Sequence, residues 1–219
     1  MKSSGLEYEC MGENLMLLAA KAMFWQARRT LLVADVHLGK VGHFRKAGIA
    51  IPKAMEQEDL AALSDLIAEY HPLRILFLGD LFHSSMNNDW DWFVLWRDMF
   101  QDIDMVLVRG NHDIIHDRFY RQLNFKLFDT LAEGPFLFSH EPLTEQELAG
   151  ANKYVISGHI HPGVKLRGKG RQSVTLPCFF FGKRQAVLPS FGKFTGRYRI
   201  RHSEDDKVFG VLGDKVVAL

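Results

Sequence analysis

Five short segments of this chain carry the side chains that metal ions bind. They read Asp35-Val36-His37, Gly79-Asp80-Leu81-Phe82-His83, Gly110-Asn111-His112-Asp113, Ser139-His140 and Gly158-His159-Ile160-His161. Together they supply carboxylates, a carboxamide and imidazoles, each at or just beyond the end of an apolar run. This mixture of ligands is sufficient to hold two divalent ions, and two adjacent ions are best suited to in-line displacement at phosphorus. The segments therefore predict phosphoryl chemistry.

The positions and types of these side chains also predict where the site lies and which ions it takes. Asp35 and Asp80 each end a run of apolar residues that is typical of a strand buried on both faces. Open α/β sheets place their sites at such carboxyl ends of parallel strands. A mixed set of nitrogen and oxygen ligands suits Mn, Fe or Zn better than Mg or Ca. We expect two divalent ions, with manganese first and iron or zinc as the alternatives.

The order of the segments resembles that of a known superfamily, the calcineurin-like metallophosphoesterases. Its pattern runs D-x-H, G-D, G-N-H-D/E, H and G-H-x-H, and every element is present between about residues 30 and 165. DVHLGK at 35–40, HFRKAG at 43–48 and LPSFGKFTG at 188–196 resemble a narrower branch, the ligase-associated DNA-damage-response (PdeM-like) phosphoesterases. The resemblance implies a metal-dependent phosphoesterase, and the branch implies a place beside a DNA ligase, a helicase and an exonuclease.

The resemblance also implies how the ligands divide between the ions. One ion would take Asp35, His37, Asp80 and His161, and the other Asp80, Asn111, His140 and His159, so that Asp80 bridges both. Metal binding lowers the pKa of water from about 15.7 toward 7, which makes a metal-bridging hydroxide the expected nucleophile. His112 is our candidate general acid. We expect Asp113 to accept a hydrogen bond from the other nitrogen of the His112 ring and so fix its orientation.

Other polar residues near the motifs are weaker candidates. Lys40, Arg45 and Lys46 follow the first ligands and could hold a distal phosphate of a nucleic-acid backbone, as Asn111 could hold the phosphoryl group. A solvated loop is the alternative for the three cations. His43 and His83 lie near the site in sequence but have no ligand position left to fill. We expect ordinary surface or core roles for the histidines outside the motifs, which are His71, His116 and His202.

Composition predicts a soluble globular protein. The 219 residues, 47% apolar and 24% charged, suit a single domain spanning 1–219. No apolar run approaches the roughly 18 residues of a membrane span, and the first residues lack the apolar region of a signal peptide. The two cysteines, Cys10 and Cys178, are too few for a disulfide framework, so we expect buried, reduced thiols and a cytoplasmic location.

The net charge of +1 conceals a basic region. No Asp or Glu occurs between Leu148 and Ser203, although eleven of the 27 Lys and Arg residues do. They are Lys153, Lys165, Arg167, Lys169, Arg171, Lys183, Arg184, Lys193, Arg197, Arg199 and Arg201. A segregated positive region favours partners that carry phosphate groups. Alternatively, these side chains are the solvated faces of strands, which an alternation such as Arg197, Arg199 and Arg201 would also produce.

The periodicity predicts an α/β fold. Strands are expected over 6–11, 15–19, 21–25, 30–35, 74–79 and 105–108, with helices over 52–70 and 89–100. Trp90, Trp92 and Trp96 in the second helix are expected to pack in the core rather than to form a base-stacking platform. Further strands are expected over 136–139, 153–157, 173–181, 186–188 and 197–201, with a pair over 208–219. The resemblance implies a four-layer α-β-β-α sandwich, with two mixed sheets face to face and flanked by helices.

Three functions compete on this sequence. The first is a dinuclear-metal phosphodiesterase that cleaves nucleic acid. The resemblance to the narrower branch implies that it would be a DNA-repair endonuclease. The second is the same chemistry on a phosphomonoester, a cyclic nucleotide or a nucleotide pyrophosphate. The third is a scaffold that has lost the chemistry, and it conflicts with a complete set of motif residues. The basic region and the branch resemblance favour nucleic acid. Because no helix-turn-helix or zinc-finger motif occurs, we expect contacts to the backbone rather than to particular bases.

Overall fold

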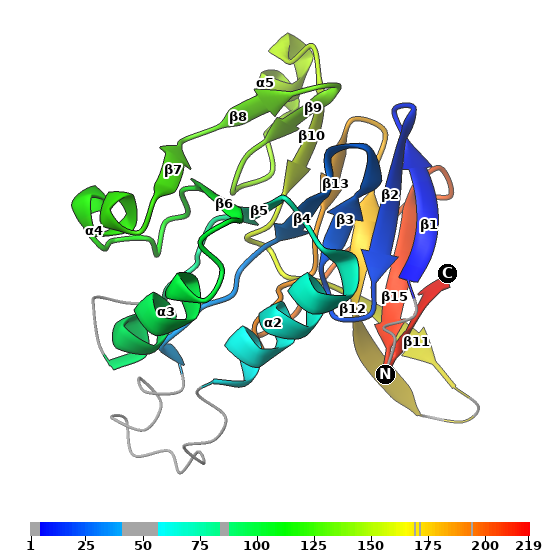
Figure 1. Ribbon diagram of the computed structural model, residues 1–219. Helices are drawn as coiled ribbons and strands as arrows, with labels where there is room; N and C mark the ends of the chain where they lie inside the picture. Colours follow the sequence, from blue (N-terminus) through cyan, green and yellow to red (C-terminus); the bar gives the residue numbers. More distant parts are fainter. Residues whose placement is uncertain (1–4, 41–56, 84–87, 169, 171, 194) are drawn as a thin grey trace.

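The computed structural model describes residues 5–40, 57–83, 88–168, 170, 172–193 and 195–219 (Figure 1). A seven-stranded sheet has the order β1-β2-β3-β4-β5-β6-β7. Its strands are β1 (Gly5–Cys10), β2 (Glu13–Leu18), β3 (Met23–Trp25), β4 (Thr30–Val33), β5 (Arg74–Leu78), β6 (Asp104–Val108) and β7 (Phe125–Phe128), with the 3-10 helix η1 (Gln26–Arg28) between β3 and β4. The strands β1 to β4 pair antiparallel, and β4 to β7 pair parallel.

A second, nine-stranded sheet contains most of the later part of the chain. Its main path has the order β14-β11-β12-β13-β10-β9-β8, and β15 and β16 branch from β12. The strands are β8 (Leu131–Glu133), β9 (Phe136–Phe138), β10 (Tyr154–Ser157), β11 (Pro162–Arg167), β12 (Ser173–Phe181), β13 (Gln185–Val187), β14 (Tyr198–Arg199), β15 (Lys207–Leu212) and β16 (Lys215–Ala218). Parallel and antiparallel pairs are mixed in this sheet as well.

The two sheets face one another across a shared apolar core. Successive side chains of a strand point to opposite faces, so Leu32 of β4 packs toward the second sheet while Leu31 packs toward the helices. Between the sheets, Trp25 of β3 meets Phe136 of β9 edge to face, with ring centroids 5.1 Å apart. Both rings are fully buried, and such pairs contribute about 0.5–1.5 kcal/mol beyond area burial.

Helices cover the other face of the first sheet. They are α2 (Glu58–Tyr70), α3 (Asn88–Asp98) and α4 (Asp117–Gln122). The apolar side chains of α2 recur at helical spacing and are buried against β4 and β5: Leu60, Leu63, Leu66 and Ile67. A short helix, α5 (Glu145–Gly150), lies near β9 and β10 (Figure 1). The predicted class, two mixed sheets face to face and flanked by helices, is confirmed, and the helices gather mainly on the first sheet.

Details of the prediction differ from the structure. Trp90 and Trp96 are buried as expected, but Trp92 is 46% exposed, because the face of α3 that carries it points away from the sheet. The strands β7, β8 and β11 and the short helices α4 and α5 were not predicted. Cys10 and Cys178 are buried free thiols, as predicted. Among the described residues, no helix has the length and apolar character needed to cross a membrane.

Candidate metal centre

The expected metal ligands lie in the turns that follow the strands, and most of them have an unusual backbone. Five adopt positive φ: Asp35 (53°), His37 (52°), Asp80 (52°), His159 (69°) and His161 (48°). Non-glycine residues rarely occupy this region, and each such residue costs about 1–3 kcal/mol unless its surroundings hold it there. Their concentration at one end of the sheets is typical of a functional site.

The first cluster consists of Asp35, His37 and His161. The Nε2 atoms of His37 and His161 lie 3.4 Å apart, and Nε2 of His161 lies 3.5 Å from Oδ1 of Asp35. Burial, followed by the charge of Lys40, lowers the pKa of His37 to about 2, so its ring is neutral at physiological pH. A neutral imidazole is the form that binds metals. The Nε2 atoms of the two histidines and the carboxylate of Asp35 thus lie close together, an arrangement that fits a shared cation.

The second cluster consists of Asp80, His140 and His159. Nδ1 of His140 lies 2.9 Å from the Leu78 carbonyl, which can only accept, so Nδ1 carries a proton and Nε2 is the nitrogen that could bind a metal. That Nε2 lies 3.0 Å from Nδ1 of His159, 3.1 Å from Oδ1 of Asn111 and 3.5 Å from Oδ1 of Asp80. Acceptor atoms therefore converge on one point, which a divalent cation would satisfy.

Asp80 lies between the two clusters. Its Oδ2 is 3.8 Å from Nε2 of His37, and its Oδ1 is 3.5 Å from Nε2 of His140. The residue is 2% exposed. One carboxylate thus presents an oxygen to each cluster, which is the arrangement that a bridging ligand needs. The structure brings all seven expected ligands together in two clusters, and their nitrogen and oxygen donors fit ions such as Mn, Fe or Zn.

Two glycines of the motifs allow the clusters to form. A Cβ atom on Gly110 would lie 2.2 Å from Oδ1 of Asp80, and one on Gly158 would lie 2.6 Å from Oδ2 of Asp35. Real Cβ atoms do not approach oxygen so closely. The glycine that precedes Asn111 and the one that precedes His159 are therefore needed because a carboxylate occupies the space of their missing side chains.

The predicted role of Asp113 is wrong. Its Oδ2 accepts the backbone N–H groups of Asp80 and Gly110 at 2.8 and 2.9 Å, and its Oδ1 accepts that of Leu81 at 3.0 Å. In the described part of the chain it makes no hydrogen bond to the His112 ring. The carboxylate instead ties the Asp80 turn to the Gly110 turn. Burial raises the pKa of Asp113 to about 6, while these backbone donors favour its charged form.

His112, the candidate general acid, is in contact with a second histidine whose role sequence reasoning did not identify. The His112 and His83 rings stack with centroids 5.2 Å apart and planes 28° apart, and the His37 ring lies 5.5 Å from His112. The backbone N–H of His112 donates to Oδ1 of Asp80. The His83 ring therefore packs against the His112 ring. The sequence feature that could have indicated this role is the position of His83, three residues after Asp80 in the same motif.

The remaining sequence candidates divide into two groups. Lys40 lies by the site: its backbone N–H donates to the His37 carbonyl, and burial lowers its pKa against the opposing charges of Asp80 and Asp35. Arg45, Lys46 and His43 lie outside the described residues. The three histidines expected to have ordinary roles are outside both clusters. His71 ends α2, His116 precedes α4 and His202 is exposed.

The chain that follows β13 supports the first cluster from behind, a contact that residue chemistry did not predict. Oγ of Ser190 and the backbone N–H of Gly192 both donate to the Asp35 carbonyl, at 2.9 and 3.1 Å. The ammonium of Lys21 donates to the carbonyls of Phe191 (2.5 Å) and Gly192 (3.2 Å). The only indication in the sequence was the LPSFGKFTG stretch, which resembled the narrower branch but did not suggest a structural role for this segment.

A fold of two facing sheets with two linked nitrogen and oxygen clusters at the strand ends defines a metal-dependent phosphoesterase. The chain belongs to the calcineurin-like phosphoesterase family, whose model matches residues 28–147. Over 99% of its length it is 32% identical to the nuclease MPE of Pseudomonas putida, all of which is covered, with a TM-score of 0.83. This match agrees with the narrower branch.

Two other solved structures are more distant. A protein of unknown function from Aquifex aeolicus is 21% identical over 65% of this chain and 82% of that chain, with a TM-score of 0.43. The phosphoesterase Yfce from E. coli is 14% identical over 86% of this chain and 96% of that chain, with a TM-score of 0.43. No curated protein matches the chain.

Proposed function

We propose that this phosphoesterase is a phosphodiesterase that cleaves nucleic acid with two divalent ions. Manganese is the native metal in this proposal. The observation that carries the chemistry is the pair of clusters that share Asp80. The neighbour from Pseudomonas putida is a nuclease, which supports nucleic acid as the substrate class. A cytoplasmic role in DNA repair, beside other repair proteins, belongs to the same proposal.

The residues would act as follows. Two ions held by the clusters would activate a water molecule and neutralise charge on the phosphoryl group. Asp80 would fix the separation of the clusters, and Asp113 would hold the turns that carry Asp80 and Asn111. His112, steadied by the His83 ring, would give a proton to the departing oxygen. Lys40 would add positive charge beside the site.

The surface next to the site supports a phosphate-rich substrate. β11 begins directly after His161, and it pairs with β14, which belongs to the basic region. A recess along these strands is lined by Lys165, Arg199, Arg201 and His202, together with Val164 and Ile200. Positive charge that continues from a metal ligand suits a backbone that carries one negative charge per nucleotide.

Three assays with added Mn²⁺ test the proposal in parallel. Two measure hydrolysis, one of an aryl phosphodiester and one of an aryl phosphomonoester, and the third measures nicking of supercoiled plasmid. We expect diester hydrolysis and nicking. Nicking should fall steeply with added salt, because each neutralised phosphate adds roughly 0.7–0.9 to the slope of log affinity against log salt. Hydrolysis of the small diester should barely change.

The control is Asp80→Asn protein from the same purification, because a contaminating nuclease would survive that substitution. Wild-type protein that hydrolyses the aryl esters but binds neither DNA nor RNA at low salt would contradict the nucleic-acid substrate. The small-molecule phosphoesterase would then take its place.

A further inference from the structure

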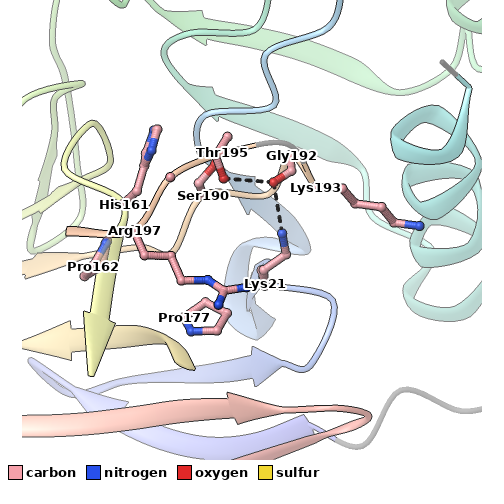
Figure 2. A pocket seen from close by; sticks show the side chains of 10 residues that line it. Lys21, His161, Pro162, Pro177, Ser190, Gly192, Lys193, Thr195 and Arg197 are labelled. Carbon is pink, nitrogen blue, oxygen red and sulfur yellow. Dashed lines mark hydrogen bonds between the residues drawn. The ribbon is translucent and has the colours of Figure 1, made fainter. Parts of the chain in front are cut away.

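A recess beside the metal centre joins four separate parts of the chain (Figure 2). Its lining includes Lys21, His161, Ser190, Lys193, Thr195 and Arg197, together with prolines and glycines. One of these is the expected metal ligand His161, and three others are cations. Among the described residues that line the recess, none is acidic.

Two of the cations converge in this recess. Figure 2 shows the side chain of Arg197 extending toward Lys21, whose own ammonium points to the Gly192 carbonyl. Lys193 extends away from both, to an ion pair with Glu58 of α2 at 2.5 Å. Lys21 is held by two carbonyls, as described above, and Nη1 of Arg197 donates to the Thr175 carbonyl at 2.8 Å. The positions of both cations are thus fixed by backbone groups rather than by a carboxylate.

The electrostatics of the recess favour an anion. Burial lowers the pKa of Lys21 to about 8 against the opposing charge of Asp59 on α2, and Arg197 and Lys193 lower it further. Like charges this close raise one another's free energy, and a bound anion would remove that repulsion. The hydroxyl groups of Thr195 and Ser190 in the lining already donate to the carbonyls of Gly192 and Asp35, so the cations are the groups that an anion would meet. Arginine binds phosphate groups through charge-assisted hydrogen bonds that are often bidentate.

The recess also has a fixed relation to the reaction centre. The backbone N–H of Tyr198 donates to the carbonyl of His161 at 3.0 Å, so the residue that follows Arg197 is bonded to the peptide of an expected metal ligand. Paired strands lie about 5 Å apart. An anion in the recess would therefore be a close neighbour of a phosphoryl group held at the metal centre.

We propose that this recess is a subsite for a second, uncleaved phosphate of the substrate, with Arg197 as its principal contact and Lys21 as its buried charge. The proposal rests on the proposed nucleic-acid function and adds to it. It means that the enzyme recognises two phosphates of one strand, the one it cleaves and a neighbour.

The test removes the charge from each side of the contact separately. The substrates are thymidine dinucleotides with a terminal p-nitrophenyl phosphodiester, which is the chromogenic bond, made as the 3′ and the 5′ isomer. Each is prepared with an ordinary internucleotide phosphate and with a neutral methylphosphonate in its place. They are assayed with wild-type protein and with Arg197→Gln. In one isomer we expect Arg197→Gln alone, or the methylphosphonate alone, to lower kcat/KM about tenfold. The variant assayed with the methylphosphonate substrate should show almost no further loss.

Arg121→Gln is the matched control, because it removes the same charge from α4, where the side chain is 68% exposed and outside the basic region. It should leave all four rates unchanged. Losses that multiply in both isomers, or no loss at all, would overturn the subsite while leaving the nucleic-acid function in place. Wild-type protein that hydrolyses bis-p-nitrophenyl phosphate but neither dinucleotide would overturn the function and the subsite together.

Discussion

At the scale of single residues, the position of Asp80 between the two clusters has the most direct consequence. We expect Asp80→Asn to reduce turnover by more than the 10- to 100-fold that is typical when a group behind a metal ligand is lost. Asparagine has the same shape and tolerates the positive φ of this position, so the fold should survive. Metal analysis of the purified variant should show a loss of both ions. Two tightly bound ions with full activity would exclude Asp80 as the bridge.

His112 should behave differently, because it contacts the clusters without belonging to either. His112→Asn should keep both ions and lower the rate by about 10²–10⁴-fold for substrates with poor leaving groups. The loss should shrink for p-nitrophenyl esters, whose leaving group needs no proton. Rates measured across a series of aryl diesters decide the matter, and equal losses throughout the series would argue against a general acid.

Asp113→Asn is predicted to weaken the site rather than the proton transfer. An amide has one acceptor oxygen, so at least one of the N–H groups of Asp80, Gly110 and Leu81 loses its partner, at about 1–3 kcal/mol each. At about 2–4 °C per kcal/mol for a chain of this size, the melting temperature should fall by several degrees. The activity loss should be the same for good and poor leaving groups. A leaving-group dependence like that of His112→Asn would restore the original expectation for Asp113.

At the scale of elements, the sequence predicted what local patterns determine. β4 and β5 are largely apolar, a carboxylate follows each of them by two residues, and parallel pairing brings those ends together. Contacts between distant parts of the chain were beyond such reasoning. The ammonium of Lys21 meets the carbonyl of Phe191 across 170 positions, and no periodicity in either segment points to the other. Asp113 was misassigned for a related reason, because adjacency to His112 in sequence says little about which donors its oxygens meet.

The Lys21 contact gives a prediction at this scale. Lys21→Met keeps the length of the side chain but leaves the carbonyls of Phe191 and Gly192 without their donor. Because Gly192 and Ser190 hold the Asp35 turn, manganese affinity should fall at the cluster of Asp35 and change little at the cluster of Asp80. Titration calorimetry with Mn²⁺ should resolve one weakened site of two.

The matched control is Lys126→Met, which removes an exposed ion pair with Asp104 and should alter neither site. Equal weakening of both sites in Lys21→Met would indicate a general loss of stability instead of a local effect on the Asp35 turn.

At the scale of the whole molecule, the class of fold followed from the order of strands and helices together with the family resemblance, and the second sheet was the less predictable half. β11 begins with Pro162 and Gly163, both unfavourable in strands, so its alternation of apolar and charged residues is only four residues long, over 164–167. It is nevertheless held by β12 and β14 on either side. Pairing with neighbours overrode local propensity there, and the same pairing places the basic region next to His161.

The metal centre should also govern the stability of the whole molecule. Without a cation, buried carboxylates and imidazole lone pairs face one another across 3.0–3.8 Å, and five of their residues have strained backbones. Ions that bind only the folded state stabilise it by about 2.7 kcal/mol at a hundred times their Kd. At about 2–4 °C per kcal/mol, Mn²⁺ added to chelator-treated protein should raise the melting temperature by roughly 5–10 °C. Mg²⁺ should raise it less, because it prefers oxygen ligands, and Asp80→Asn should lose most of the increase. A melting temperature that saturating Mn²⁺ leaves unchanged would mean that the clusters do not bind the ion.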